Sequence, residues 1–152
     1  DAADYALRTA TAKGESVVQA RNAPDELVIS ADTVVVRKDK ILEKPRDDDH
    51  ARDMLSKLSG KTHKVITGVA LFHKGRSCGF HASTKVTFSK LTAAAIDDYV
   101  ATGDPLDKAG GYGIQGRAGC FVEGIDGCYH NVVGLPVNRL ARELQGFLAD
   151  QW

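Results

Sequence analysis

The chain has 152 residues, of which 43% are hydrophobic, and this length favours one well-buried domain over two. Its 20 basic and 20 acidic residues cancel, which excludes a global field that would attract nucleic acid or an acidic membrane surface. Three unevenly spaced cysteines, Cys78, Cys120 and Cys128, without a C-x-x-C pair, exclude a disulfide framework and favour a reducing, cytoplasmic setting.

The first expected element is a moderately amphipathic helix over residues 1–20, with Asp4 near its start and Lys13 in its middle. Its apolar positions among polar neighbours are Tyr5, Leu7, Ala10, Val17 and Val18. Residues 22–25 contain a proline and an asparagine, and they end the helix before the next element.

A run of aliphatic and β-branched residues over 27–36 predicts a strand buried on both faces. Asp32 interrupts this run, and a carboxylate inside a buried strand requires a cation, a lysine or a metal as its partner. A turn over 38–40 and a short return strand at 41–42 then predict a hairpin. A hairpin of that length can bring the Lys44 ammonium group back toward Asp32.

Three consecutive acidic residues at 47–49 could suggest a metal site, but a helix start explains them better. One aspartate caps a helix that runs through Leu58, and the others favour its positive N-terminal dipole. The helix repeats apolar residues at Ala51, Met54, Leu55 and Leu58, which predicts a core-facing side.

Two further strands are expected over 65–72 and 78–88, joined by a turn at Lys74-Gly75. Thr92 is the expected N-cap of a helix that ends before Gly103. A last helix begins at Pro136. Its expected apolar face consists of Val137, Leu140, Ala141, Leu144 and Leu148. No apolar run in the chain approaches the roughly 20 residues that a membrane-spanning helix needs.

The window 103–134 holds nine of the chain's 15 glycines, interleaved with apolar residues that indicate a folded segment. Glycines let backbone N–H groups approach a ligand closely or adopt positive φ. The stretch 107–116 therefore resembles a loop built to hold an anion, with Lys108 as its charge. It is not a Walker A loop, because Lys108 precedes the glycines.

One buried-strand acid, Asp32, and three lysines on separate elements, Lys13, Lys44 and Lys108, suit a phosphate ester or anhydride bound through a divalent cation. The competing interpretation is a structural ion pair between Asp32 and Lys44, with glycines that only shape a tight fold. The five histidines show no metal-ligand spacing, so we expect them on the surface or in hydrogen bonds.

Several motifs, in the same order over almost the whole chain, resemble the Maf, or septum formation, family of nucleotide pyrophosphatases. They are S-A-D-T-V-V (30–35), E-K-P (43–45), L-S-G-K-T-H (58–63), T-G-V-A (67–70), Y-V-A-T-G-D-P-L-D-K-A-G-G-Y-G-I-Q-G (99–116) and N-V-V-G-L-P (131–136). The resemblance implies a mixed α/β fold of the inosine triphosphatase type, with a curved central sheet flanked by helices in two lobes and a cleft between them.

The resemblance also implies a substrate and a cofactor. The substrate is a nucleoside triphosphate, hydrolysed between its α and β phosphates to a monophosphate and pyrophosphate with Mg²⁺ or Mn²⁺. By position, Asp32 matches the catalytic acid, which accepts a proton from the attacking water and lies close to the metal. Lys44 and Lys108 match lysines that face the phosphates, and Lys13 matches a helix lysine.

Thr33 and Gln115 match the positions that accompany a preference for dTTP and UTP. A hydroxyl and an amide can read the carbonyl and N–H edge of uracil or thymine. The resemblance further suggests a homodimer.

The family's opening strand and its S-x-S-P-R-R element are absent from this sequence. We therefore expect residues 1–152 to be a single Maf-like domain that is N-terminally incomplete. Two alternatives stay open from the sequence: an inosine or xanthosine triphosphatase, and a nucleotide-binding regulator of cell division that does not hydrolyse its ligand.

Overall fold

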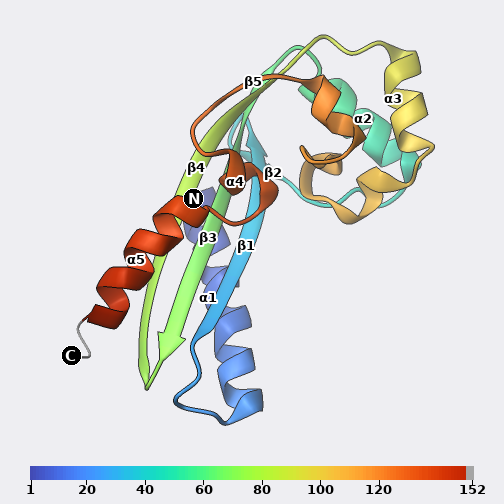
Figure 1. Ribbon diagram of the computed structural model, residues 1–152. Coiled ribbons are helices and arrows are strands. Elements are labelled where there is room, and N and C mark those ends of the chain that lie inside the picture. Colours follow the sequence, from blue (N-terminus) through green and yellow to red (C-terminus); the bar gives the residue numbers. More distant parts are fainter. Residues whose placement is uncertain (150–152) are drawn as a thin grey trace.

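Five strands form one sheet in the computed structural model, which describes residues 1–149, and every strand pairing is antiparallel (Figure 1). The order is β2-β1-β3-β4-β5. The strands are β1 Val28–Arg37, β2 Lys40–Leu42, β3 Thr62–His73, β4 Arg76–Phe88 and β5 Val122–Asp126. The expected mixed α/β class with helices around a central sheet is confirmed.

Helices cover both faces of this sheet, and α2 and α3 form a separate group at one end of it, which gives the two expected lobes (Figure 1). The helices are α1 Ala2–Arg21, α2 Asp48–Leu58, α3 Ala93–Val100, α4 Tyr129–Val133 and α5 Val137–Ala149. Three short 3-10 turns are η1 Asp104–Asp107, η2 Ala109–Gly111 and η3 Arg117–Phe121. No helix within residues 1–149 is both long and apolar enough to cross a bilayer.

The hydrophobic core is divided by the sheet. Helix α1 packs on one face, where Ala6 contacts a cluster that includes Val34 and Ile66. On the opposite face, α2 and α3 pack with Val35 and Val65 in the largest cluster, and α5 packs over a third cluster farther along the strands. The space between these last two clusters lies over the middle of β1 and β3.

Strand β1 is buried less than its composition predicts. Val34, Val35 and Val36 are buried, but the preceding half of the strand is partly exposed, and Ile29 is 41% exposed. The prediction of burial on both faces is wrong for this half. The reason is that β2 pairs only with residues 35–37, so the outer edge of β1 before Val35 has no neighbouring strand among residues 1–149.

Helix α1 packs mainly through small residues. Tyr5, Val17 and Val18 are exposed, which corrects that part of the predicted apolar face, whereas the predicted Ala10 is buried and the predicted Leu7 is partly buried. The buried positions of the helix are Ala6, Ala10 and Gly14. Small residues every fourth position let the helix lie very close to the sheet.

Opposite this stripe of α1, β3 carries Gly68. A Cβ atom at Gly68 would lie 2.4 Å from the backbone nitrogen of Leu7. No side chain fits there without moving the helix.

Local signals in the other helices are confirmed. Asp47 caps α2 by accepting a hydrogen bond from the His50 N–H, and the next two aspartates lie in the first turn. Thr92 caps α3 in the same way. In α5 the packed face includes Leu140, Leu144, Leu148 and the buried Phe147, whereas the predicted Val137 and Ala141 are exposed.

Candidate active site

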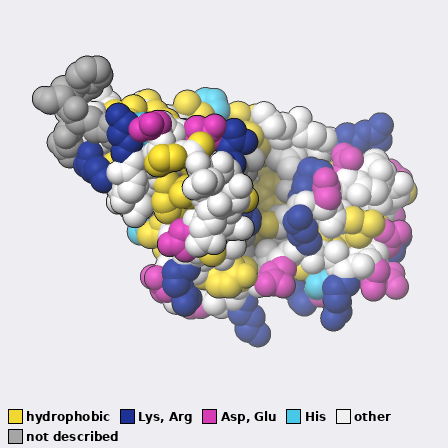
Figure 2. Space-filling view, turned by 90° about the horizontal axis from the view of Figure 1, so that it is seen from below, with side chains coloured by type: hydrophobic (Ala, Val, Ile, Leu, Met, Phe, Trp, Pro, Cys, Tyr) yellow, Lys and Arg dark blue, Asp and Glu magenta, His cyan; other side chains and the backbone are white. Residues whose placement is uncertain are grey.

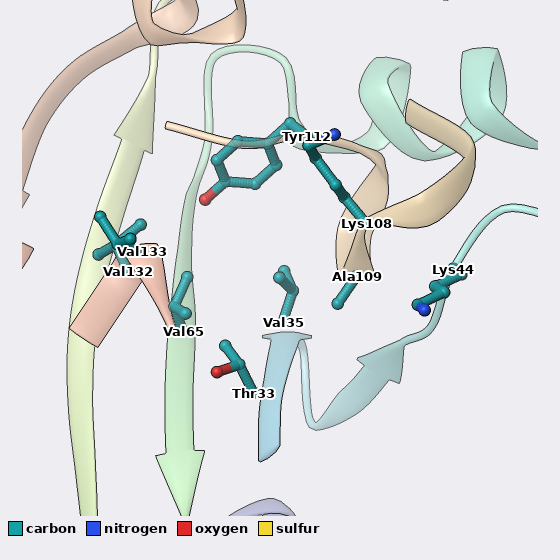
Figure 3. Close-up of a pocket in the computed structure, with 9 residues that line it drawn as sticks. All are labelled: Thr33, Val35, Lys44, Val65, Lys108, Ala109, Tyr112, Val132 and Val133. Atoms are coloured by element: carbon teal, nitrogen blue, oxygen red, sulfur yellow. The ribbon is translucent and has the colours of Figure 1, made fainter. Parts of the chain in front are cut away.

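Two adjoining pockets meet at the open edge of β1, between the two lobes. The first has a volume of about 260 Å³ and is drawn in Figure 3; the second has about 320 Å³. Thr33, Lys44 and Ala109 line both, so the two pockets form one continuous cleft. Figure 2 shows the surface hollowed between the lobes, with basic side chains on both sides of the hollow.

The two pockets differ in chemistry. The walls of the first are mainly apolar, formed by Val35, Val65, Ala109, Tyr112, Val132 and Val133 (Figure 3). The second contains the charged residues Asp32, Glu43 and Lys44. The cleft therefore offers an apolar half beside a charged half.

Asp32 and Thr33 are neighbours in β1 and so point to opposite faces of the sheet. Asp32 lies on the α1 face, opposite Gly68, and its carboxylate accepts a hydrogen bond from Lys13 Nζ at 2.5 Å. Its side chain is 17% exposed, so it remains accessible at the open edge. The expected cationic partner of Asp32 is thus present, but it is Lys13 from α1. The Asp32–Lys44 ion pair of the competing interpretation is not formed.

Lys44 is positioned by the segment that follows β2, as the hairpin predicts. It lines both pockets, and in Figure 3 it lies beside Ala109. The backbone joins this segment to η2, because the Gly110 N–H donates to the Glu43 carbonyl oxygen at 3.2 Å. Gly110 has φ of 72°, and a Cβ there would meet the Val35 side chain at 2.9 Å. Glycine is required at this contact.

Lys108 lines the first pocket but its ammonium group is held by its own loop. It donates to the Asp104 carbonyl oxygen at 3.0 Å and to the Asp107 carboxylate at 2.8 Å. This hydrogen bond lowers the pKa of Asp107 below its ordinary value. In Figure 3 the Lys108 side chain runs away from Thr33. A phosphate in the cleft would have to draw this ammonium group from Asp107.

Thr33 belongs to a chain of hydrogen bonds on the α4 face. Its Oγ1 lies 2.9 Å from Thr67 Oγ1, and Thr67 donates to the Asn131 carbonyl oxygen at 3.1 Å. The Asn131 side chain is fully buried and donates to the Val65 carbonyl oxygen at 3.0 Å and to Thr84 Oγ1 at 3.1 Å. These bonds fix α4, which carries two of the valines of the first pocket.

Tyr112 forms another wall of the first pocket and is anchored beneath it. Its hydroxyl lies 2.6 Å from Nε2 of His63, a side chain that is only 2% exposed. Burial lowers the pKa of His63 to about 4, so its ring is neutral at pH 7. Burial likewise raises the pKa of Tyr112. The expectation that the histidines serve in hydrogen bonds is confirmed for His63.

Sequence reasoning named five of the cleft's polar residues and missed others. Asp32, Thr33, Lys44 and Lys108 line the two pockets, and Lys13 reaches the cleft only through its hydrogen bond to Asp32. Gln115 does not line either pocket and is exposed. Thr67, Asn131 and His63 were missed as parts of the site. The available signal was position, since all three stand in the quoted motifs: His63 ends L-S-G-K-T-H, Thr67 begins T-G-V-A and Asn131 begins N-V-V-G-L-P.

The residues of the cleft fit a hard divalent cation. Asp32 and Glu43 line the same pocket and supply carboxylate oxygens, the ligand type that Mg²⁺ and Mn²⁺ prefer. Within residues 1–149, no group of three or more His, Cys, Asp or Glu side chains is placed to enclose a metal. Mg²⁺ is often held by one or two carboxylates together with substrate phosphates and water, and the second pocket offers two.

The chain is similar to known proteins over nearly its whole length. A model of the Maf-like protein family matches residues 1–147. A dTTP/UTP pyrophosphatase of Bacillus cereus (strain B4264) is 49% identical over 147 residues, which are 97% of this chain and 76% of the relative. The chain belongs to the Maf family. A dTTP/UTP pyrophosphatase of Bacillus thuringiensis subsp. konkukian (strain 97-27) is 48% identical, with the same shares covered.

Proposed function

We propose that this Maf family protein is a metal-dependent nucleoside triphosphate pyrophosphatase. It hydrolyses the α–β phosphoanhydride of dTTP and UTP and releases a nucleoside monophosphate and pyrophosphate. The observation that carries this proposal is the juxtaposition at the edge of β1: the Asp32–Lys13 pair and Lys44 lie beside an apolar pocket whose polar contact is Thr33. The names of the relatives give the same activity.

The substrate lies across the strand edge in this proposal. Its pyrimidine ring enters the apolar pocket between Val35, Val65 and Tyr112, where burial of the ring faces is favourable. Its phosphates extend into the charged half of the cleft, where Lys44 supplies positive charge and Lys13 lies against Asp32, with Lys108 across the boundary in the first pocket.

The carboxylates of Asp32 and Glu43 are the groups that would hold Mg²⁺ or Mn²⁺ there. Such an ion supplies charge neutralisation for the phosphates when it is bound.

Asp32 has the chemistry of a general base in this reaction. It accepts a proton from the water that attacks the α-phosphorus, a P–O bond forms to that water, and the bond from the α-phosphorus to the bridging oxygen breaks. The pyrophosphate leaves with the electron pair of that bond. Lysine ammonium groups stabilise the charge on the leaving pyrophosphate, and Lys13 also holds the Asp32 carboxylate in place by the hydrogen bond at 2.5 Å.

The test is pyrophosphate release from UTP and dTTP by the protein with Mg²⁺ or Mn²⁺, compared with its Asp32→Asn variant. We expect the variant to lose at least about 100-fold in kcat/KM, the usual size of a general-base contribution. Asp39→Asn is the matched control, because Asp39 lies in the exposed β1–β2 turn. Equal turnover by Asp32→Asn and the wild-type protein would remove Asp32 from the catalytic role.

Two further assays separate the alternatives. ITP and XTP turned over faster than UTP would indicate a purine triphosphatase. Nucleotide-dependent thermal stabilisation without pyrophosphate release would indicate a binding protein that does not hydrolyse.

Cys78, Cys120 and Cys128 are all free thiols, which supports the cytoplasm as the place of action.

A further inference from the structure

The hydroxyl groups of Thr33 and Thr67 face each other across two neighbouring strands. The two residues are direct cross-strand partners, and their Oγ1 atoms are 2.9 Å apart. Thr67 is fully buried, whereas Thr33 reaches the cleft and lines both pockets. Thr67 therefore acts on the cleft only through the groups that it contacts.

The position of the acceptor behind Thr67 is fixed. Thr67 donates to the Asn131 carbonyl oxygen at 3.1 Å, and the Asn131 side chain is itself held by Val65 and Thr84. A carbonyl oxygen has no hydrogen to give, so the 3.1 Å contact is a hydrogen bond only when the hydroxyl hydrogen of Thr67 points to Asn131, and we assign it there. Thr67 Oγ1 then faces Thr33 as an acceptor.

It follows that the hydroxyl hydrogen of Thr33 is used inside the protein. It fits the bond to Thr67 Oγ1 at 2.9 Å, and the Gly134 carbonyl oxygen, at 3.4 Å, is a longer acceptor on the same inner side. In both arrangements Thr33 presents only oxygen lone pairs to a ligand. Thr33 therefore accepts from an N–H group and does not donate to a phosphate oxygen.

We propose that Thr67 is a specificity-determining positioning residue: by taking up the hydrogen of Thr33, it makes Thr33 an acceptor that selects bases with a ring N–H. Uracil and thymine carry N–H at ring position 3, where cytosine carries a lone pair. The inference rests on the proposed pyrimidine nucleotide function. In it, Thr33 contacts the base of the nucleotide, and the lysines contact the phosphates.

The experiment compares wild-type protein with Thr67→Val, which has nearly the same shape but no hydroxyl oxygen. We measure binding of UMP and CMP by titration calorimetry without metal, and kcat/KM for UTP and CTP with Mg²⁺. Thr67→Val removes the nearer acceptor of the Thr33 hydrogen and leaves only the Gly134 carbonyl oxygen at 3.4 Å, so that hydrogen can turn toward a ligand. The preference for uracil over cytosine should then fall by about tenfold, the size of one hydrogen bond. The Asn131 carbonyl oxygen keeps the Gly134 N–H as a partner at 3.1 Å, so the local backbone remains bonded.

Two further variants keep the test decisive. Thr67→Ser retains the oxygen and should restore the wild-type preference, and Thr67→Ala removes the oxygen without adding bulk if the valine variant does not fold. A purely structural role would weaken UMP and CMP equally. An unchanged UMP-to-CMP ratio in the valine or alanine variant would overturn the proposal. Absence of pyrophosphate release from UTP by the wild-type protein would instead count against the proposed function, and the binding ratios would still decide the role of Thr67.

Discussion

The polar side chains on the two faces of β1 differ in how deeply their hydrogen-bond partners are buried. On the α4 face, Thr33 joins a buried set of hydrogen bonds through Thr67 and Asn131, both of which are fully buried. On the α1 face, Asp32 meets Lys13, whose side chain is 55% exposed. One face fixes the shape of the cleft, and the other face keeps charge accessible to solvent and substrate.

Because of this difference, we expect substitutions on one face to change mainly the stability of the protein and substitutions on the other face to change mainly its activity. A buried polar group that loses its partner destabilises the fold by the full desolvation of the group left behind. An exposed ion pair contributes little to stability, because water and salt screen it. Variants on the α4 face should therefore unfold more easily, and variants on the α1 face should remain folded but lose activity.

The largest effect on stability is expected for Asn131→Ala. The substitution removes a fully buried amide that donates to the Val65 carbonyl oxygen and to Thr84 Oγ1, so the free energy of unfolding should fall by roughly 3 kcal/mol. Urea denaturation measures this change. Asn138→Ala, at an exposed position of α5, is the matched control, and a loss below about 1 kcal/mol in Asn131→Ala would contradict the comparison.

A smaller loss of stability is expected when the pH is lowered. It arises from His63, which lies on the same face of the sheet as Thr33. Its pKa falls from 6.5 to about 4 on burial, so the unfolded state binds more protons between these two values. Its contribution to stability is complete above pH 6.5 and is lost as the pH falls toward 4. Between pH 7 and pH 5 this amounts to roughly 2 kcal/mol.

The measurement is denaturant unfolding at a series of pH values, with His63→Gln as the variant. Glutamine does not titrate, so this part of the pH dependence should disappear in His63→Gln. His81→Gln, at an exposed position of β4, should keep it. A wild-type stability that stays flat between pH 7 and pH 5 would show that His63 does not hold a depressed pKa.

The smallest effect on stability is expected for Lys13→Met, on the α1 face. Because the Lys13 side chain is 55% exposed and Asp32 still reaches solvent at the open edge of β1, water can replace the ammonium group, and the free energy of unfolding should change by less than about 1 kcal/mol. Pyrophosphate release from UTP should nevertheless fall by at least about tenfold, since in the proposed mechanism the ammonium group orients Asp32 and stabilises charge on the phosphates. Lys57→Met, which breaks an exposed Lys57–Asp53 pair on α2, should leave activity unchanged. Equal activity losses in the two variants would contradict this role of Lys13.

The sequence predicted those parts of the fold that depend on neighbours along the chain. Asp47 and Thr92 mark the starts of α2 and α3, because a side chain that caps a helix acts within three residues. The turn after β1 places Lys38 and Asp39 at positive φ, and the short return strand follows it as expected. Asp32 could be singled out because a carboxylate within an apolar run is visible in the sequence whichever face of the strand it occupies.

Contacts between distant segments were less predictable. Lys13, and not Lys44, pairs with Asp32 because α1 lies closer to the sheet than its large apolar residues suggested. Asn131 gave no local signal of burial, since its partners Val65 and Thr84 lie on other elements. The pairing of His63 with Tyr112 likewise depends on how the glycine-rich loop folds back over β3.

The glycine at position 68 has a consequence for the charge balance of the cleft. Because no Cβ fits between it and Leu7, the spacing between α1 and the sheet is set by backbone touching backbone. The reach of Lys13 to Asp32 depends on that spacing. Gly68 thus sets the distance between α1 and the sheet. A side chain at this position would push α1 away from the sheet and move the ammonium group of Lys13 away from the Asp32 carboxylate.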